Sequence, residues 1–220
     1  MTSQPSIHAL IEAVRAADSA RALAGAVRNL AQTRSPEAIP LLIEALGYNN
    51  PGAAVAAVEG LVGLGELAVP AILEQLDGYN YGARAWGIRA LAAIGDPRGL
   101  DILTEAAKND FALSVRRAAA RGLGNILWDR LEATPREQER ERVHHCLIQV
   151  TEDPEWVVRY AAVVGIEGLV KNGRSPEPSW VPQSLARLER LSSEDEVLVV
   201  RARALLACQN LQTGVTAGVN

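Results

Sequence analysis

The sequence predicts an all-α protein, an α-solenoid (superhelix) of about six helix pairs, and three observations lead to this prediction. Ala-rich apolar segments recur and align on one set of positions, 30, 32, 43 and 42 residues apart: Leu61, Leu91, Leu123, Ile166 and Cys208. Each segment follows another stretch with apolar residues at helical spacing, bounded by Gly, Pro or Asp. Hydrophobic residues make up 48% of the 220 residues and aromatic residues only 4%, a composition that suits closely packed helices.

The predicted elements follow in chain order. Residues 7–33 read as a divergent first pair, so we expect residues 1–33 to cap the N-terminal end of the stack. Further first helices are expected where apolar residues recur at helical spacing, over Ile39–Leu46, Val69–Leu76, Leu100–Ala107, Val143–Val150 and Leu185–Leu191. Each leads into a second helix with an aligned apolar position and another three residues later: Leu64, Ile94, Ile126, Leu169 and Leu211.

The two long steps of the repeat locate insertions at residues 127–142 and 171–180. The first is charged and helix-prone, and the second, with Pro176 and Pro178, is expected to be an ordered loop or short linker. We expect one domain over residues 1–211, and a disordered tail over the small, polar residues 212–220.

A regular Asp–Arg spacing supports the register. Three aspartates each precede an arginine by six residues, with a valine just before the arginine: Asp110 and Arg116, Asp153 and Arg159, Asp195 and Arg201. An acid in the turn and an arginine at the start of the second helix predict a ladder of hydrogen bonds between neighbouring repeats, with a structural role. Asp77 and Arg84 lie seven residues apart, so this unit has an extra residue in its turn.

Charge and composition narrow the function classes. The net charge of −4 and the pI of about 5.5 give a nucleic-acid partner no electrostatic support. The best candidate for a membrane span, residues 53–73, is interrupted by two glutamates and a proline, and no signal peptide opens the chain. Two cysteines make no disulfide framework, so a reducing cytoplasm is expected.

One repeat unit departs from the others and predicts a binding groove. Counting about 100° per residue, Trp86 and Arg89 fall opposite the apolar stripe of their helix, and Arg121 occupies the equivalent position one repeat later. Second helices line the concave face of a solenoid, the usual binding surface. Tyr79 and Tyr81, from the preceding turn, are expected at the rim of the groove.

The groove chemistry suits a flat, conjugated, anionic ligand. Indole and phenol rings offer stacking surface, arginines can hold carboxylates bidentately, and Asp77 can accept hydrogen bonds from ring N–H groups. Trp, Tyr and Arg are also enriched in interface hot spots, so a protein–protein contact patch fits the spacing equally well.

The other polar constellation is His144-His145-Cys146. A metal site needs more ligands, and the third histidine, His8, is near the N-terminus, so no metal is expected. Imidazole beside thiol could transfer protons, which makes His145 and Cys146 weak catalytic candidates, but the helical pattern places Cys146 in the core. Cys208 occupies an aligned core position. The sequence contains no phosphate-binding loop or nucleophile motif.

Several segments resemble the F-type subunits of heterodimeric phycobilin lyases, members of the HEAT-like repeat lyase family of cyanobacteria. The resemblance covers about residues 7–211, and its most specific part is Tyr79-Asn80-Tyr81-Gly82-Ala83-Arg84-Ala85-Trp86. Residues 50–61, 93–98, 114–123 and 152–162 also carry it, although the Asp–Arg ladder is shared with many HEAT-like proteins.

The resemblance implies an enzyme subunit of the carbon–sulfur lyase type. With an E-type partner, it would attach phycocyanobilin by a thioether at the ethylidene carbon of ring A to a cysteine of the phycocyanin α chain. The bilin is then a substrate, no cofactor is needed, and the nucleophile belongs to the acceptor.

The resemblance also assigns residues to this bilin. Trp86, Tyr79 and Tyr81 would contact its plane, Arg89 and Arg121 its propionates, and Asp77 its pyrrole N–H groups; Asn80 and Arg84, in the same stretch, complete the bilin-binding set. Trp156 and Tyr160 would contact the partner or acceptor.

Other functions stay open. Some relatives also isomerise the bilin and carry His-Cys followed by Gln-Gly-Asn; here His145-Cys146 is followed by Leu147-Ile148-Gln149, which favours plain attachment. A non-enzymatic adaptor for phycobilisome disassembly or bilin removal, or a scaffold without bilin chemistry, would have the same fold.

Overall fold

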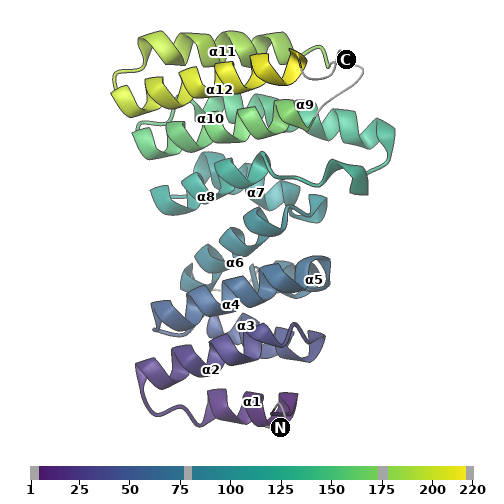
Figure 1. Cartoon of the computed structure of the whole chain (residues 1–220), viewed down its shortest axis with the longest axis vertical. Helices are drawn as coiled ribbons and strands as arrows, with labels where there is room; N and C mark the ends of the chain where they lie inside the picture. Colours follow the sequence, from purple (N-terminus) through teal and green to yellow (C-terminus); the bar gives the residue numbers. More distant parts are fainter. Residues whose placement is uncertain (1–4, 77–80, 173–177, 217–220) are drawn as a thin grey trace. The chain divides into compact units, whose positions relative to one another are not determined.

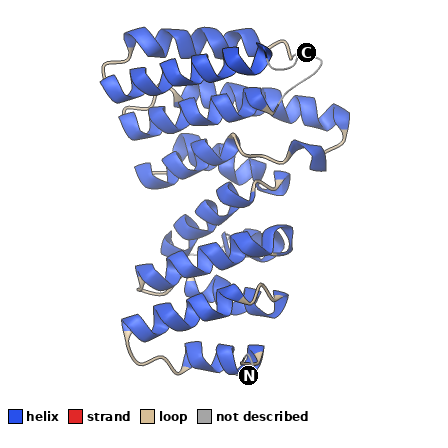
Figure 2. Ribbon diagram, in the orientation of Figure 1, coloured by secondary structure: helices blue, strands red, loops and turns tan. Residues whose placement is uncertain are grey.

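The computed structural model describes residues 5–76, 81–172 and 178–216, and every regular element in these ranges is helical (Figures 1 and 2). The α-helices are α1 Ile7–Arg15, α2 Ala20–Gln32, α3 Ile39–Ala45, α4 Pro51–Leu64, α5 Val69–Leu76, α6 Tyr81–Ile94, α7 Leu100–Asn109, α8 Leu113–Leu123, α9 Ala133–Val150, α10 Trp156–Lys171, α11 Val181–Glu194 and α12 Leu198–Thr216. Short 3-10 helices are η1 Pro36–Ala38, η2 Gly65–Leu67, η3 Pro97–Gly99 and η4 Trp128–Arg130. The predicted all-α fold is confirmed.

Consecutive helices pack as pairs, α1 with α2 and so on to α11 with α12, as the repeat predicts. By their packing, the helices form two compact units, the first over residues 1–96 and the second over residues 97–220. The aligned positions Leu61, Leu91, Leu123 and Ile166 are almost fully buried, and Cys208 is buried as well, so the register read from the repeats is correct.

In the first unit, α2, α4 and α6 pack in series and α3 packs against α5. Serine and asparagine side chains start the helices: Ser19 Oγ accepts a hydrogen bond from Ala22 N, and Asn50 Oδ1 accepts one from Ala53 N. Gly60 allows α4 to approach α2 closely, because a Cβ there would lie 2.7 Å from Ala31 Cβ.

In the second unit, the second helices α8, α10 and α12 pack in series, and α9 packs against both α7 and α11. Three glycines bring α8 and α10 into backbone contact. A Cβ on Gly124 would lie 2.6 Å from the carbonyl oxygen of Gly165, and a Cβ on Gly168 would overlap the Gly124 carbonyl. No larger residue fits at this crossing without moving backbone.

The first insertion is helical, as its helix-prone sequence predicts, and the C-terminal end is more helical than expected. Most of the charged insertion at 127–142 belongs to η4 and to the first turns of α9. Residues 173–177 of the second insertion lie outside the described residues. Helix α12 continues to Thr216, so residues 212–216 are helical rather than part of a disordered tail, because extending an existing helix avoids the cost of a new nucleus.

Among the described residues, no single helix has the length and apolar character to cross a membrane; residues 51–67 and 69–76 meet the length and composition test only together, and they are bent by 118°.

Candidate functional site

Helix α6 carries four of the predicted groove and bilin-binding residues that the structure describes, Tyr81, Arg84, Trp86 and Arg89. Its core side is formed by Gly87, Leu91 and Ile94, which are buried, whereas Trp86 and Arg89 are half-buried on other faces of the helix. Gly87 lets α6 lie close to α5, because a Cβ there would lie 2.9 Å from Leu76 Cδ2. The first turns of α6 also present Tyr81 and Arg84, both half-buried.

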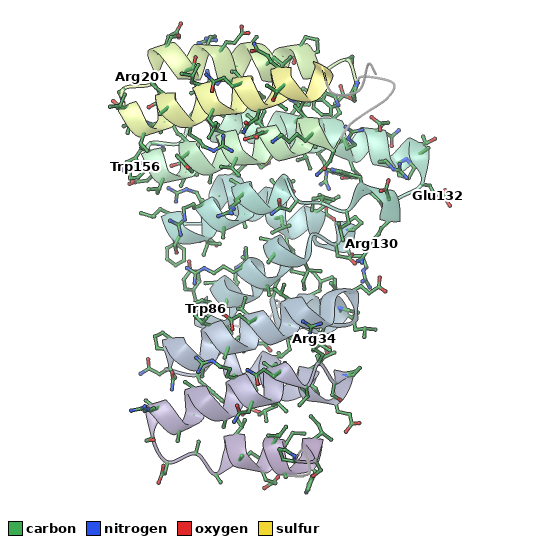
Figure 3. All side chains as sticks on the ribbon, viewed as in Figure 1. Arg34, Trp86, Arg130, Glu132, Trp156 and Arg201 are labelled. Carbon is green, nitrogen blue, oxygen red and sulfur yellow. The ribbon has the colours of Figure 1, made fainter. Side chains whose placement is uncertain are left out.

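Trp86 and Arg89 are in direct contact. The guanidinium carbon of Arg89 lies 4.3 Å from the centre of the Trp86 ring, a cation–π arrangement between residues three apart on one helix. Figure 3 labels Trp86 on α6. This contact covers part of one indole face and orients the guanidinium, so the pair offers a flat surface with a positive charge fixed beside it.

The other predicted bilin-binding residues lie outside the described residues or in the second unit. Asp77, Tyr79 and Asn80 lie outside the described residues. Arg121 is exposed on α8, a helix of the second unit.

Trp156 and Tyr160, the candidates for partner or acceptor contact, lie on the first turns of α10. Trp156 is exposed, and Figure 3 places it near the end of that helix. Tyr160 is half-buried, with the guanidinium carbon of Arg203 6.0 Å from its ring centre.

The His144-His145-Cys146 segment divides between core and surface. Cys146 is buried on α9, where its thiol contacts the Thr104 carbonyl at 3.6 Å and burial raises the pKa to about 11. His144 is also buried, with Nδ1 2.9 Å from Ser184 Oγ, its ring stacked on Trp180, and burial lowering its pKa. His145 is exposed, 4.0 Å from Glu141. The two weak catalytic candidates therefore face different environments, and the thiol stays protonated at neutral pH.

The predicted Asp–Arg ladder is present in the second unit. Arg116 binds Asp153 of the next repeat through two nitrogens, Nε at 2.7 Å and Nη2 at 3.2 Å. Arg159 binds Asp195 in the same way, at 2.8 and 3.0 Å. Each arginine also donates from Nη1 to the carbonyl oxygen of its own turn aspartate, a bond that the spacing alone does not reveal.

The turn aspartates have a second task. Asp153 Oδ1 accepts a hydrogen bond from Glu155 N, and Asp195 Oδ1 accepts one from Val197 N, both at 2.8 Å. Burial by itself would raise the pKa of Asp195, but its hydrogen bonds with Arg159 and Val197 N and the nearby arginine charges hold it below its usual range.

Sequence reasoning missed a second buried charge cluster, centred on Glu167 of α10. Its carboxylate binds Lys171, Arg203 and Asn210, so α10 and α12 are joined by charges as well as by apolar packing. Burial would raise the Glu167 pKa, but these hydrogen bonds lower it. The only sequence signal is one acidic residue between Ile166 and Leu169, at otherwise apolar positions.

Comparison with known proteins gives the family context. The model "HEAT repeats" matches residues 54–124 and 69–164, and the model "PBS lyase HEAT-like repeat" matches residues 20–48. The chain is 58% identical to "Phycocyanin alpha phycocyanobilin lyase CpcF" of Synechocystis sp., over 77% of this chain and 79% of that protein. It is 48% identical to "Phycocyanobilin lyase subunit beta" of Nostoc sp., over 90% and 96% of the two chains.

Solved structures agree with these relatives. One chain in the complex of CpcE and CpcF of phycocyanin lyase from Nostoc sp. matches with a TM-score of 0.72 and 50% identity, over 79% of this chain and 99% of that one. A designed armadillo repeat protein matches with a TM-score of 0.54 at 16% identity, which shows a shared fold alone.

Proposed function

The chain belongs to the phycobilin lyase family with HEAT-like repeats, and from this premise we infer that it is the F-type subunit of a phycocyanobilin lyase. It attaches phycocyanobilin to a cysteine of the phycocyanin α chain and acts as a heterodimer with an E-type subunit. Its 58% identity to the CpcF lyase subunit carries this conclusion. A cytoplasmic location at sites of phycobilisome assembly fits this role.

The attachment step is an addition that needs no oxidant. The acceptor thiolate forms a C–S bond with the ethylidene carbon of ring A, the double bond to that carbon breaks, and a proton is added to the adjacent ring carbon. The sulfur comes from the acceptor in this scheme, which accords with the burial of Cys146 and Cys208 in this chain. A buried thiol with a pKa of about 11 is also a poor acid–base group for isomerising the bilin.

The bilin is held by the α6 surface in this proposal. Trp86 stacks on the tetrapyrrole plane, and Arg89, oriented by its contact with the indole, pairs with a propionate. Tyr81 and Arg84 follow from the same helix, and Asp77, Tyr79, Asn80 and Arg121 complete the proposed set. The role of such a surface is to select one bilin conformation and hold ring A toward the acceptor thiol.

Reconstitution tests this function. The chain would be co-expressed with its E-type partner, the phycocyanin α apoprotein and the enzymes that make phycocyanobilin, and the α chain would be examined after denaturation. A covalent phycocyanobilin adduct that disappears when the chain is omitted supports the lyase subunit. A blue-shifted adduct would instead indicate isomerisation, and a stable complex without any adduct would favour the adaptor.

A matched pair of substitutions tests the α6 surface. Trp86→Ala should reduce bilin binding and adduct yield at least about tenfold if stacking carries much of the affinity. Leu67→Ala, at an exposed residue of η2, provides the control. Equal adduct yields for Trp86→Ala and the unchanged chain would rule out this placement of the bilin.

A further inference from the structure

The last arginine of the ladder differs from the two before it. Arg201 donates from Nη1 to the carbonyl oxygen of its own turn residue Asp195 at 2.7 Å, as Arg116 and Arg159 do with theirs. No carboxylate among the described residues binds its Nε or Nη2, the two atoms that hold the next aspartate in the earlier repeats. Figure 3 labels Arg201 on α12.

Residues 197–220 contain no carboxylate side chain that could bind Arg201. No Asp or Glu follows Glu196 in the sequence, and Glu196 itself lies 3.3 Å from Nη2 of Arg159. Among the described residues, Arg201 therefore makes hydrogen bonds only to the backbone carbonyls of Asp195 and Glu196.

The face of α12 beyond the last repeat is apolar. Four residues after the ladder arginine, α8 has Ala120 and α10 has Val163, and both are fully buried. The same position on α12 is Leu205, which is 51% exposed. Leu198, three residues before Arg201, is 70% exposed, and its equivalents Leu113 and Trp156 are exposed as well, at 42% and 43%. Ala202, next to Arg201, is also exposed.

We define the terminal face as Leu198, Arg201, Ala202 and Leu205. Its character is unusual for the end of a repeat array, because terminal repeats ordinarily have a polar outer side. The N-terminal pair follows that rule: α1 and α2 have no exposed large apolar side chain among the residues described there. At Arg201 and Leu205, the terminal face thus resembles the surface through which internal repeats contact their neighbours.

We propose that the terminal face docks a helix pair of the E-type partner subunit, whose turn supplies an acidic side chain to Arg201. This inference rests on the proposed function, which requires such a partner. Leu205 would be buried as its equivalents Ala120 and Val163 are within the chain, and the Nε and Nη2 donors of Arg201 would hold a carboxylate as Arg116 and Arg159 do. The partner would continue the ladder across the interface.

A second copy of the chain fits this face less well. Two-fold packing of two terminal faces would bring two Arg201 side chains with like charge onto one apolar surface. Head-to-tail packing would leave a new terminal face on each added copy and produce an open filament. A different chain with an acidic turn satisfies the arginine and ends the array.

The test measures the affinity of the purified full chain for the purified E-type subunit by isothermal titration calorimetry. Leu205→Glu places a charge in the apolar part of the terminal face and should weaken binding at least about tenfold. Leu67→Glu, a similarly exposed leucine of the first unit, should bind as the unchanged chain does. Because both leucines are exposed, neither substitution should alter thermal unfolding of the isolated chain.

Arg201→Gln tests the ladder arginine, with Arg190→Gln on exposed α11 as its control. Only Arg201→Gln should weaken binding, and Arg201→Lys should restore little of it, since lysine lacks the bidentate geometry.

Unchanged affinity for both Leu205→Glu and Arg201→Gln would overturn the proposal, even where bilin attachment proceeds normally. Light scattering that shows dimers of the isolated chain, separated by Leu205→Glu, would overturn it in favour of a second copy. Failure of the unchanged chain to bind the E-type subunit would instead contradict the proposed function.

Discussion

The two units join successive helix pairs by different interactions, a neutral hydrogen bond in the first unit and ion pairs in the second. In the first unit, the neutral side chain of Asn50 accepts a hydrogen bond from Ala53 N at 3.0 Å and donates to the carbonyl oxygen of Ala20, in the preceding pair, at 2.8 Å. In the second unit, Asp153 and Asp195 accept hydrogen bonds from the backbone N–H two residues later, and they bind the preceding pair through arginine. The neutral Asn50 amide therefore makes the link between helix pairs that buried ion pairs make in the second unit.

This difference predicts where the molecule tolerates substitution. Removing one partner of a neutral hydrogen bond lowers the free energy of unfolding modestly, whereas leaving a buried charge without its partner lowers it much more. The second unit should therefore be the more fragile one toward single changes in its turns.

Asp195→Ala should have the largest effect. It leaves the almost fully buried Arg159 without its main partner and removes the cap on Val197 N, so the free energy of unfolding should fall by about 3–5 kcal/mol. Urea denaturation followed by circular dichroism measures this loss. Asp101→Ala, which removes an exposed partner of Arg142, is the control and should cost less than about 1 kcal/mol. Similar losses for both would refute the contrast.

Gly165→Ala should come next. The added Cβ would overlap the carbonyl oxygen of Ala120, which belongs to the backbone of α8 and cannot turn away, so about 1–3 kcal/mol should be lost. Gly87→Ala in the first unit meets the flexible end of Leu76 instead, and higher helix propensity offsets part of its cost. Thermal unfolding of the two variants separates them, and a larger loss for Gly87→Ala would reverse the comparison.

Asn50→Ala should cost about 1–2 kcal/mol, the value of a helix cap together with one hydrogen bond. Asn50→Asp keeps the cap but places a charge against the Ala20 carbonyl without an arginine, so it should not restore full stability. The same urea experiment measures both, and a loss of more than about 3 kcal/mol would show that the neutral link matters as much as the ionic one.

Acid should weaken the second unit before the first. Asp195 and Glu167 have pKa values below their usual ranges, so their stabilisation is complete above about pH 4.3 and is lost as the pH falls through the lower values of the folded state. Asn50 does not titrate. Trp86→Phe removes the only tryptophan of the first unit, so fluorescence of this variant between pH 5 and 2 reports the second unit alone. Loss of circular dichroism from this variant at a higher pH than its fluorescence change would show that the first unit unfolds earlier and would contradict the prediction.

Cys146→Ser should have the smallest effect, with adduct yield within about twofold of the unchanged chain, because a buried thiol with a raised pKa takes no part in attachment. The reconstitution assay measures this. A variant that still binds the bilin and yields no adduct would assign the second unit a chemical role.

Most of the fold was predictable because two patterns mark the repeats: the spacing of apolar residues from Leu61 to Cys208, and the six-residue interval between Asp and Arg. The ladder pairs between repeats followed from that interval. The role of Asn50 was not predicted, since no arginine six residues later marks it as a turn residue of the same kind. The Glu167 cluster was missed because its partners Arg203 and Asn210 are more than 35 residues away in the sequence.

Less of the candidate site was predictable. The helical pattern placed Trp86 and Arg89 away from the core, but it treated them as separate ligand contacts, whereas the structure stacks one on the other. Pattern identifies the faces of a helix; it does not select the rotamers that bring two neighbours on α6 into contact. Burial of Cys146 was predictable because its neighbours Val143 and Leu147 lie on the same apolar stripe.

The ladder also bears on how such a chain can grow. Both pairs join the same two positions of successive repeats, so tandem duplication of one repeat within the gene would supply a new arginine and a new aspartate together and create no additional unmatched charge. For the same reason, the arginine of one repeat could bind the aspartate of any other repeat, so the ion pairs do not select which repeats become neighbours. The crossing of α8 and α10 selects the neighbouring repeat instead, because its close backbone contact requires Gly124, Gly165 and Gly168.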